Sequence, residues 1–256
     1  MLTDQQLERY ARHIILHEVG GQGQSKLLNA KVLVVGAGGL GSPLLMYLAA
    51  AGVGTIGIVD NDHVALSNLQ RQIIHPTNAL DQPKTASAEN ALNAINPEIT
   101  INCYPVRLND QNVDKIMTDY DIVADGCDNF TTRLIVNAAC VKHQKTLVSG
   151  ALSKFDGQVS VFAPHKSRKG DKPLPCYQCF VPSVPNDEAT RTCATEGILG
   201  VIAGVVGTLQ ATEVIKEILG LGDSLAGHIL MYDGLSSSTR KIALPADPAC
   251  PICGQK

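Results

Sequence analysis

The chain has 256 residues, of which 45% are hydrophobic, and a formal net charge of −3. This length suggests one large or two small domains, with enough apolar residues for a sizeable core. Few aromatic residues and no long basic run argue against nucleic-acid binding. The N-terminal stretch MLTDQQLERYARHIIL carries charges where a secretion signal needs an apolar core, so we expect a cytoplasmic protein.

The spacing of apolar residues predicts alternating helices and strands along the chain. We expect helices at 2–16, 40–51, 84–96, 131–143 and 197–219, with the glycine-rich VGGQGQ at 19–24 as a break. We expect strands at 32–35, 55–59, 99–106, 121–124, 147–148, 158–162, 229–232 and 240–244. The most apolar segment, 197–209, is shorter than the roughly 20 residues that cross a bilayer. Membrane association is therefore not expected.

The stretch VLVVGAGGLGSP contains Gly36, Gly38 and Gly41 in the pattern G-x-G-x-x-G, between an expected strand and an expected helix. The next strand ends at Asp60. Such glycines let the backbone approach a phosphate, and the following helix offers unpaired N–H groups. The motif predicts a nucleotide site, but it fits a nicotinamide cofactor as well as ATP. An NAD-dependent oxidoreductase therefore stays open at this point.

The order of strands and helices predicts a Rossmann-like, doubly wound α/β fold with a mostly parallel sheet. We expect a single domain over 1–256. It would comprise an N-terminal helical arm (1–30), a nucleotide-binding core (31–164), and a C-terminal part (165–256) with a crossover loop, a long helix and further strands.

Polar residues in two stretches could contact a nucleotide. SNLQRQ (67–72) and Lys84 can reach ribose and phosphates, although a solvated helix start is the alternative. Asp125 and Asp128 in DGCDNFTTR follow a short apolar strand, where ligands bind in parallel sheets. A carboxylate there can hold magnesium, whereas capping of the next helix by Asp128 or Asn129 is the alternative.

Four of the eight cysteines form two C-x-x-C pairs, Cys176/Cys179 and Cys250/Cys253. Two such pairs can complete a tetrahedral zinc site, and a redox dithiol is the alternative. With four sulfur ligands no coordination position stays open, so the metal would be structural. The loop before the first pair carries a basic cluster, which a solvated loop explains better than a binding patch: Lys166, Arg168, Lys169 and Lys172.

The other four cysteines differ in their surroundings. Cys103 and Cys140 are expected to pack as small apolar residues. The neighbouring Asp128 should raise the pKa of Cys127, which argues against a nucleophile. Cys193 lies two residues after Arg191 and before the long helix, and both features favour a thiolate. It is the candidate nucleophile.

Taken together, the motifs resemble the MoeB/ThiF (HesA/MoeB/ThiF) family, whose members adenylate ubiquitin-like sulfur carriers. The matching stretches occur in order along nearly the whole chain: RYARHIIL, GAGGLGSP, DND, LSNLQRQ, QPK, DGCDNFTTR, CYQC, GVVGTLQATEVIK, MYDG and CPIC.

The resemblance implies roles for individual residues. Gly39 and Asp60 would contact ATP, with Asp60 on the ribose, and Asp128 would hold magnesium beside Asn129. Further nucleotide and phosphate contacts would come from Ser67, Asn68, Leu69, Gln70, Arg71 and Lys84. Zinc would be held by Cys176, Cys179, Cys250 and Cys253. Cys193 occupies the position of the family's thioester-forming cysteine, and Arg12 that of an arginine reaching the partner subunit's ATP site in a homodimer.

The implied reaction is adenylation of the C-terminal Gly-Gly carboxylate of a small carrier protein, for molybdopterin or thiamine biosynthesis. Because no further domain follows the last cysteine pair, we expect a separate sulfurtransferase or cysteine desulfurase as the sulfur donor. An NAD-dependent oxidoreductase would leave Arg12, the NLQRQ stretch and Lys84 without a purpose. A structural module that only binds a carrier is the third hypothesis.

Overall fold

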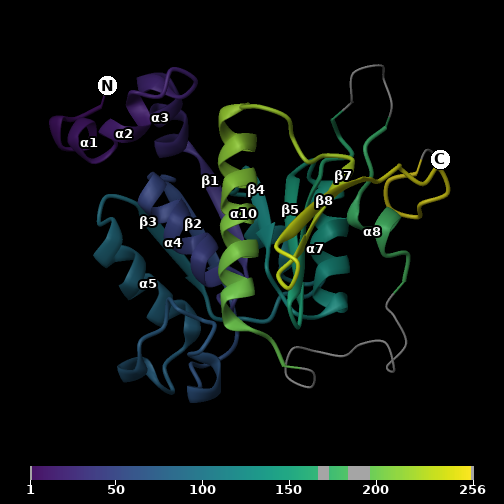
Figure 1. Cartoon of the computed structure of the whole chain (residues 1–256), viewed down its shortest axis with the longest axis horizontal. Coiled ribbons are helices and arrows are strands. Elements are labelled where there is room, and N and C mark those ends of the chain that lie inside the picture. The colour runs from purple at the N-terminus through teal and green to yellow at the C-terminus, as the bar shows by residue number, and fades with distance from the viewer. Residues whose placement is uncertain (1, 167–172, 184–196, 255–256) are drawn as a thin grey trace.

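The computed structural model describes residues 2–166, 173–183 and 197–254. In this part of the chain, eight strands form one sheet in the order β3-β2-β1-β4-β5-β6-β7-β8 (Figure 1). They are β1 (Lys31–Val35), β2 (Thr55–Val59), β3 (Thr100–Tyr104), β4 (Ile122–Asp125), β5 (Thr146–Ser153), β6 (Asp156–Phe162), β7 (His228–Asp233) and β8 (Ser238–Ala243). Strands β1 to β5 are parallel, whereas β5–β6, β6–β7 and β7–β8 pair antiparallel.

Helices cover both faces of this sheet. The helices are α1 (Asp4–Arg9), α2 (Ala11–Ile14), α3 (Gly20–Asn29), α4 (Gly41–Ala51), α5 (Lys84–Ile95), α6 (Val113–Met117), α7 (Phe130–Lys142), α8 (Tyr177–Phe180) and α10 (Gly200–Leu219), with short 3-10 turns η1 (Leu66–Asn68) and η2 (Thr77–Ala79). Val32 and Val34 of β1 pack with α4, α5 and α10, while Leu33 and Val35 pack with α6 and α7. The predicted doubly wound, mostly parallel α/β fold is confirmed.

Several elements differ from the sequence-based prediction. The single helix expected over 2–16 is two short helices that meet at Tyr10. The glycine-rich stretch expected to break the chain instead begins α3, whose Gly23 lies close to Leu219 of α10: a Cβ there would be 3.4 Å from the Leu219 side chain. Helices α6 and α8 were not predicted, and the long helix begins at Gly200 rather than three residues earlier.

The N-terminal helices are fixed to the edge of the sheet at which the parallel strands begin. The Tyr10 hydroxyl accepts a hydrogen bond from Asn96 at 2.9 Å and lies against Gly52, where a Cβ would be 2.4 Å from it. Gln24 is fully buried, pairs with His13 at 3.0 Å and donates to the Ala51 carbonyl. Figure 1 shows α1 and α2 beside α3, the helix that precedes β1.

None of the helices in the described part of the chain combines the length and apolarity that a membrane span requires.

Candidate nucleotide and metal sites

A cleft of about 880 Å³ opens at the carboxyl ends of the parallel strands. Its walls include residues directly after three neighbouring strands: Gly36 after β1, Asp60 after β2 and Gly126 after β4. The strand order reverses direction between β1 and β4, and such switch points are where doubly wound sheets bind ligands. The cleft is therefore the expected position for a nucleotide.

Each glycine of the motif has a distinct structural reason. Gly36 has φ of +96°, which L side chains rarely adopt. Gly41 packs so closely that a Cβ would lie 2.0 Å from the Gly36 carbonyl oxygen. At Gly38, by contrast, a Cβ would meet only the Gln72 amide nitrogen, at 3.6 Å. Gly36 and Gly41 thus shape the turn, and Gly38 leaves room in the cleft.

Asp60 holds the glycine turn in place. Its carboxylate accepts hydrogen bonds from the backbone N–H groups of Ala37 at 2.8 Å and Asp62 at 2.9 Å. Burial raises the pKa of Asp60, and the nearby Lys84 opposes that shift. The acid that was predicted at the end of the second strand therefore lies in the cleft wall beside the turn.

Two of the predicted cations face the same cleft. Lys84 is buried at the start of α5, and its Nζ pairs with the exposed carboxylate of Asp62 at 2.8 Å. Arg71 is half-buried and donates from Nη1 to the Ser67 carbonyl at 3.1 Å. Its stem lies over Gly39, where a Cβ would be 3.6 Å from Arg71 Cγ. The fold thus brings Gly39, Arg71 and Lys84 together.

The rest of the LSNLQRQ stretch is placed differently. Ser67, Asn68, Leu69 and Gln70 do not line the cleft, so their nucleotide contacts stay predictions. Gln72 does line it: this side chain is buried, and its Oε1 has no hydrogen-bond partner among the described residues. Such a buried oxygen needs a hydrogen-bond donor, which an ordered water or a ligand group can supply.

In the DGCDNF loop, different residues are placed for the two predicted roles, magnesium binding and capping of the next helix. Asn129 caps α7, since its side chain accepts a hydrogen bond from Thr132 N at 2.8 Å. Asp128 makes no cap, is exposed and lines the cleft. Asp125 is buried and forms an ion pair with Arg133, with 3.7 Å between Arg133 Nη1 and Asp125 Oδ2. Asp128 is consequently the carboxylate available to a magnesium ion.

Sequence reasoning missed three cleft residues. Asp62 pairs with Lys84, Arg107 follows the end of β3, and Arg133 is buried behind the loop. The rule that ligands bind beyond the carboxyl ends of strands could have indicated Arg107. Nothing in the local sequence around Arg133 distinguishes it from a solvated helix charge.

Arg12 lies far from the cleft of its own chain. It is exposed on α2, which packs on α3 at the amino edge of the sheet, whereas the cleft is at the carboxyl edge. Five-residue strands at about 3.3 Å per residue separate the two edges by roughly 15 Å. Arg12 therefore cannot reach the cleft of its own chain. Cys193, Arg191, Arg168, Lys169 and Lys172 lie outside the described residues.

The two C-x-x-C pairs converge on one point. The sulfur atoms of Cys176, Cys179, Cys250 and Cys253 all lie within 4.8 Å of one another. The Cys176–Cys250 and Cys179–Cys253 sulfur distances are 3.6 Å and 3.4 Å, too long for disulfides. Sulfurs bound to zinc at about 2.3 Å in a tetrahedron lie at comparable separations. The four thiols fit a zinc ion with no open coordination position.

Three other cysteines of the described part of the chain are poorly placed to act as nucleophiles. Burial raises the pKa of Cys127 well above its usual value, with the Asp125 carboxylate adding to the shift. Burial, with Glu89 nearby, raises the pKa of Cys103 to about 12. Cys140 is fully packed against α6 through Met117. Cys140 is packed as expected, whereas Cys103 is only half-buried. The raised pKa expected for Cys127 is found, but its causes are burial and Asp125 rather than Asp128.

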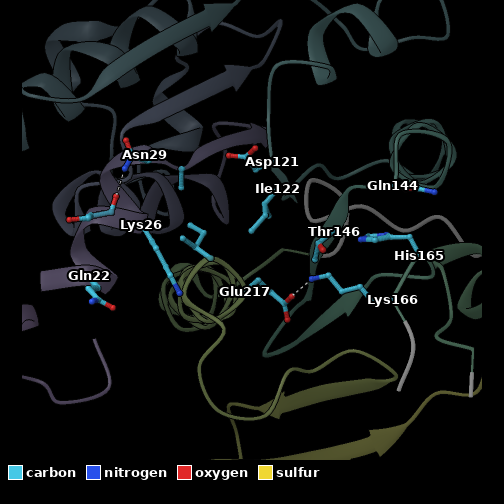
Figure 2. Close-up of a pocket in the computed structure, with 13 residues that line it drawn as sticks. Gln22, Lys26, Asn29, Asp121, Ile122, Gln144, Thr146, His165, Lys166 and Glu217 are labelled. Carbon is cyan, nitrogen blue, oxygen red and sulfur yellow. Dashed lines mark hydrogen bonds and ion pairs between the residues drawn. The ribbon is translucent and has the colours of Figure 1, made fainter. Parts of the chain in front are cut away.

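A second cavity, of about 550 Å³, lies at the opposite edge of the sheet (Figure 2). Figure 2 shows an ion pair between Lys166 and Glu217, 2.9 Å apart, on one side of this cavity and Asn29 of α3 on another. It contains none of the residues predicted to act in the reaction.

The site and fold together define a nucleotide-binding enzyme. Its cleft combines a glycine turn, cations and the Asp128 carboxylate, and its C-terminal segment carries a four-cysteine cluster that could hold a metal ion. The ThiF family model matches residues 10–252, and the chain belongs to this family. The chain is 47% identical over 254 residues to the "Sulfur carrier protein adenylyltransferase" of Thermus thermophilus, covering 99% of this chain and 93% of that one. It is an adenylyltransferase.

Two further relatives differ in length. The "SAMP-activating enzyme E1" of Haloferax volcanii is 42% identical, covering 98% of this chain and 90% of that one. The "Adenylyltransferase and sulfurtransferase MOCS3" of Drosophila virilis is 45% identical, but this chain spans only 55% of it. Among solved structures, E. coli MccB with ATP shares the fold, with a TM-score of 0.82 at 24% identity over 96% of this chain and 75% of that one.

Proposed function

We propose that the protein adenylates the C-terminal Gly-Gly carboxylate of a ubiquitin-like sulfur carrier, for thiocarboxylation in molybdopterin or thiamine biosynthesis. The observation that carries the proposal is one cleft holding Arg71, Lys84, Asp128 and the glycine turn. The relatives named for sulfur carrier and SAMP activation support the choice of substrate. An NAD-dependent oxidoreductase is not favoured, because it gives the two cations and Asp128 no task.

The chemistry needs charge stabilisation more than proton transfer. An α-carboxyl group has a pKa of about 3.5, so the carrier terminus is already ionised at neutral pH. Its approach to a triphosphate is opposed by roughly 4 kcal/mol per pair of unit charges at 4 Å in an effective dielectric of 20. Arg71 and Lys84 would offset this repulsion. Asp128, with Asn129 beside it, would hold magnesium, which neutralises phosphate charge when bound.

Bond changes balance without a co-reactant other than ATP. A carboxylate oxygen attacks the α-phosphorus, the bond from that phosphorus to the bridging oxygen breaks, and pyrophosphate leaves. The fold would hold the reacting groups in line, and the cations stabilise the charge that builds on pyrophosphate. This step needs no sulfur atom. A thiol such as Cys193, and a separate sulfurtransferase or cysteine desulfurase, would act only on the finished acyl-adenylate.

The test is ATP–pyrophosphate exchange with small carriers from the same organism that end in Gly-Gly. We expect exchange with such a carrier and none when its last two residues are removed. Asp128→Asn and Arg71→Ala should each lower kcat by about 10²–10³, the usual cost of losing one charge-stabilising group. Absence of exchange with every such carrier, together with tight NAD binding, would overturn the proposal in favour of the oxidoreductase.

A further inference from the structure

A buried ion pair anchors the loop that carries Asp128. Arg133 and Asp125 are 6% and 1% exposed, and they lie on α7 and at the end of β4. Resting on the function proposed above, we propose that Arg133 is a positioning residue that fixes the Asp128 carboxylate for metal binding.

Both backbone polar groups of Cys127, the residue before Asp128, end on this ion pair. Its N–H donates to Asp125 Oδ1 at 2.9 Å, and its carbonyl accepts a hydrogen bond from Arg133 Nη2. The peptide units on both sides of Cys127 are therefore each held by the ion pair, and the second of them is bonded to Asp128. These contacts fix the backbone from which the Asp128 side chain extends into the cleft.

The guanidinium is itself fixed by β5. Arg133 Nη2 also donates to the Gly150 carbonyl at 2.8 Å, and Nη1 to Ser149 Oγ at 3.3 Å. The Ser149 hydroxyl in turn donates to Asp125 Oδ2 at 3.2 Å, which closes a ring of polar contacts. The Nη1 and Nη2 groups thus bind the Asp128 loop and β5. Arg133 acts through the loop.

The four-cysteine segment supports the same side chain. Tyr177, directly after Cys176, interacts with the Arg133 guanidinium. Asn137, one turn further along α7, accepts a hydrogen bond from Tyr177 N at 2.8 Å and donates to Cys176 Sγ at 3.6 Å. Helix α7 thus connects the metal cluster on one side with the Asp128 loop on the other.

Arg133→Lys tests the inference, because it keeps the charge but removes the planar fork that reaches two carbonyls and a hydroxyl. In the full-length protein, ATP binding would be titrated by calorimetry at several Mg²⁺ concentrations. We expect the half-saturating Mg²⁺ concentration to rise about tenfold or more, as for loss of other groups that orient metal ligands. Amide hydrogen exchange at 126–129 should become faster in the same variant.

The matched control is Glu213→Gln. Glu213 is also buried and forms an ion pair, with 2.6 Å between its Oε1 and Lys216 Nζ, but it does not line the cleft. This variant should have a lower melting temperature, but the Mg²⁺ dependence of its ATP binding and its amide hydrogen exchange at 126–129 should not change. If Arg133→Lys does not fold, Ser149→Ala carries the test with a smaller effect in the same direction, since both charges stay.

Asp128→Asn separates this inference from the proposed function. If Asp128→Asn leaves the Mg²⁺ dependence of ATP binding unchanged, Asp128 does not hold the metal and the inference is overturned. ATP–pyrophosphate exchange by the wild-type protein tests the proposed function separately. The inference would be overturned if the Arg133 and Ser149 variants bound ATP with the wild-type dependence on Mg²⁺ and showed wild-type amide hydrogen exchange at 126–129.

Discussion

At the scale of single residues, two glycines of the same turn have different roles: Gly41 is needed for packing, and Gly38 leaves room for a ligand. Gly41→Ala forces a Cβ to 2.0 Å from the Gly36 carbonyl oxygen, so the turn must deform. We expect a loss of about 1–3 kcal/mol in the free energy of unfolding, as for other overpacked sites. Thermal unfolding followed by circular dichroism measures this change.

Gly38→Ala is the contrasting substitution. A Cβ there meets only the Gln72 amide, at 3.6 Å, and otherwise occupies the cleft. We expect an unchanged melting temperature but ATP binding weaker by tenfold or more, about 1.4 kcal/mol. Calorimetric titration with ATP measures it. If Gly38→Ala binds ATP normally, the phosphates do not lie over this turn.

Which site residues the sequence could reveal depends on how local their role is. Gly36, Gly41 and Asp60 act within one turn and its neighbouring strand, and their spacing along the chain indicates that role. Arg133 acts through the backbone carbonyl of Cys127 and through two residues of β5. These two, Ser149 and Gly150, lie 16 and 17 residues away along the chain. Such a contact forms only after the strands pair, so no pattern in the local sequence predicts it.

At the scale of elements, α3 shows the same difference between what the local sequence indicates and what contacts between distant residues produce. Three glycines in VGGQGQSKLLN favour a break by propensity. The structure forms a helix because Gly23 allows close approach to α10 and Gln24 buries two hydrogen bonds. Tertiary packing overrides propensity there. The strands β1, β2 and β4, by contrast, are buried on both faces, so they form short apolar runs that the sequence reveals directly.

The C-terminal segment is predicted to depend on its metal. Cys253→Ser removes one of four converging sulfurs, and we expect less than one zinc per chain and a loss of at least about 3 kcal/mol in stability, in the upper range for single substitutions. Metal analysis and thermal unfolding measure the two effects. The cleft residues are unchanged, so ATP binding should persist well below the new melting temperature. Wild-type protein purified without zinc would instead favour a redox dithiol.

At the scale of the whole molecule, the position of Arg12 requires a second copy if this residue acts in the reaction. Its helix is held at the amino edge of the sheet by Tyr10 and Gln24, opposite the cleft. The same short segment exposes Ile15 and Leu16, at 70% and 50%. Exposed apolar side chains beside a cation suit a surface that packs on another protein. A two-fold homodimer would supply each cleft with one such arginine.

Mixed dimers test this arrangement. Arg12→Ala and Asp128→Ala homodimers should each lose most exchange activity, since removing one charge-stabilising group costs about 2–4 kcal/mol. After subunit exchange at equal mixing, half of the dimers are hybrids, and each hybrid has one cleft with wild-type Arg12 from one chain and wild-type Asp128 from the other. Activity should therefore rise to about a quarter of the wild-type value. If mixing restores no activity although labelled subunits have exchanged, Arg12 has no role in the partner's cleft; its distance from its own cleft then leaves it a surface charge.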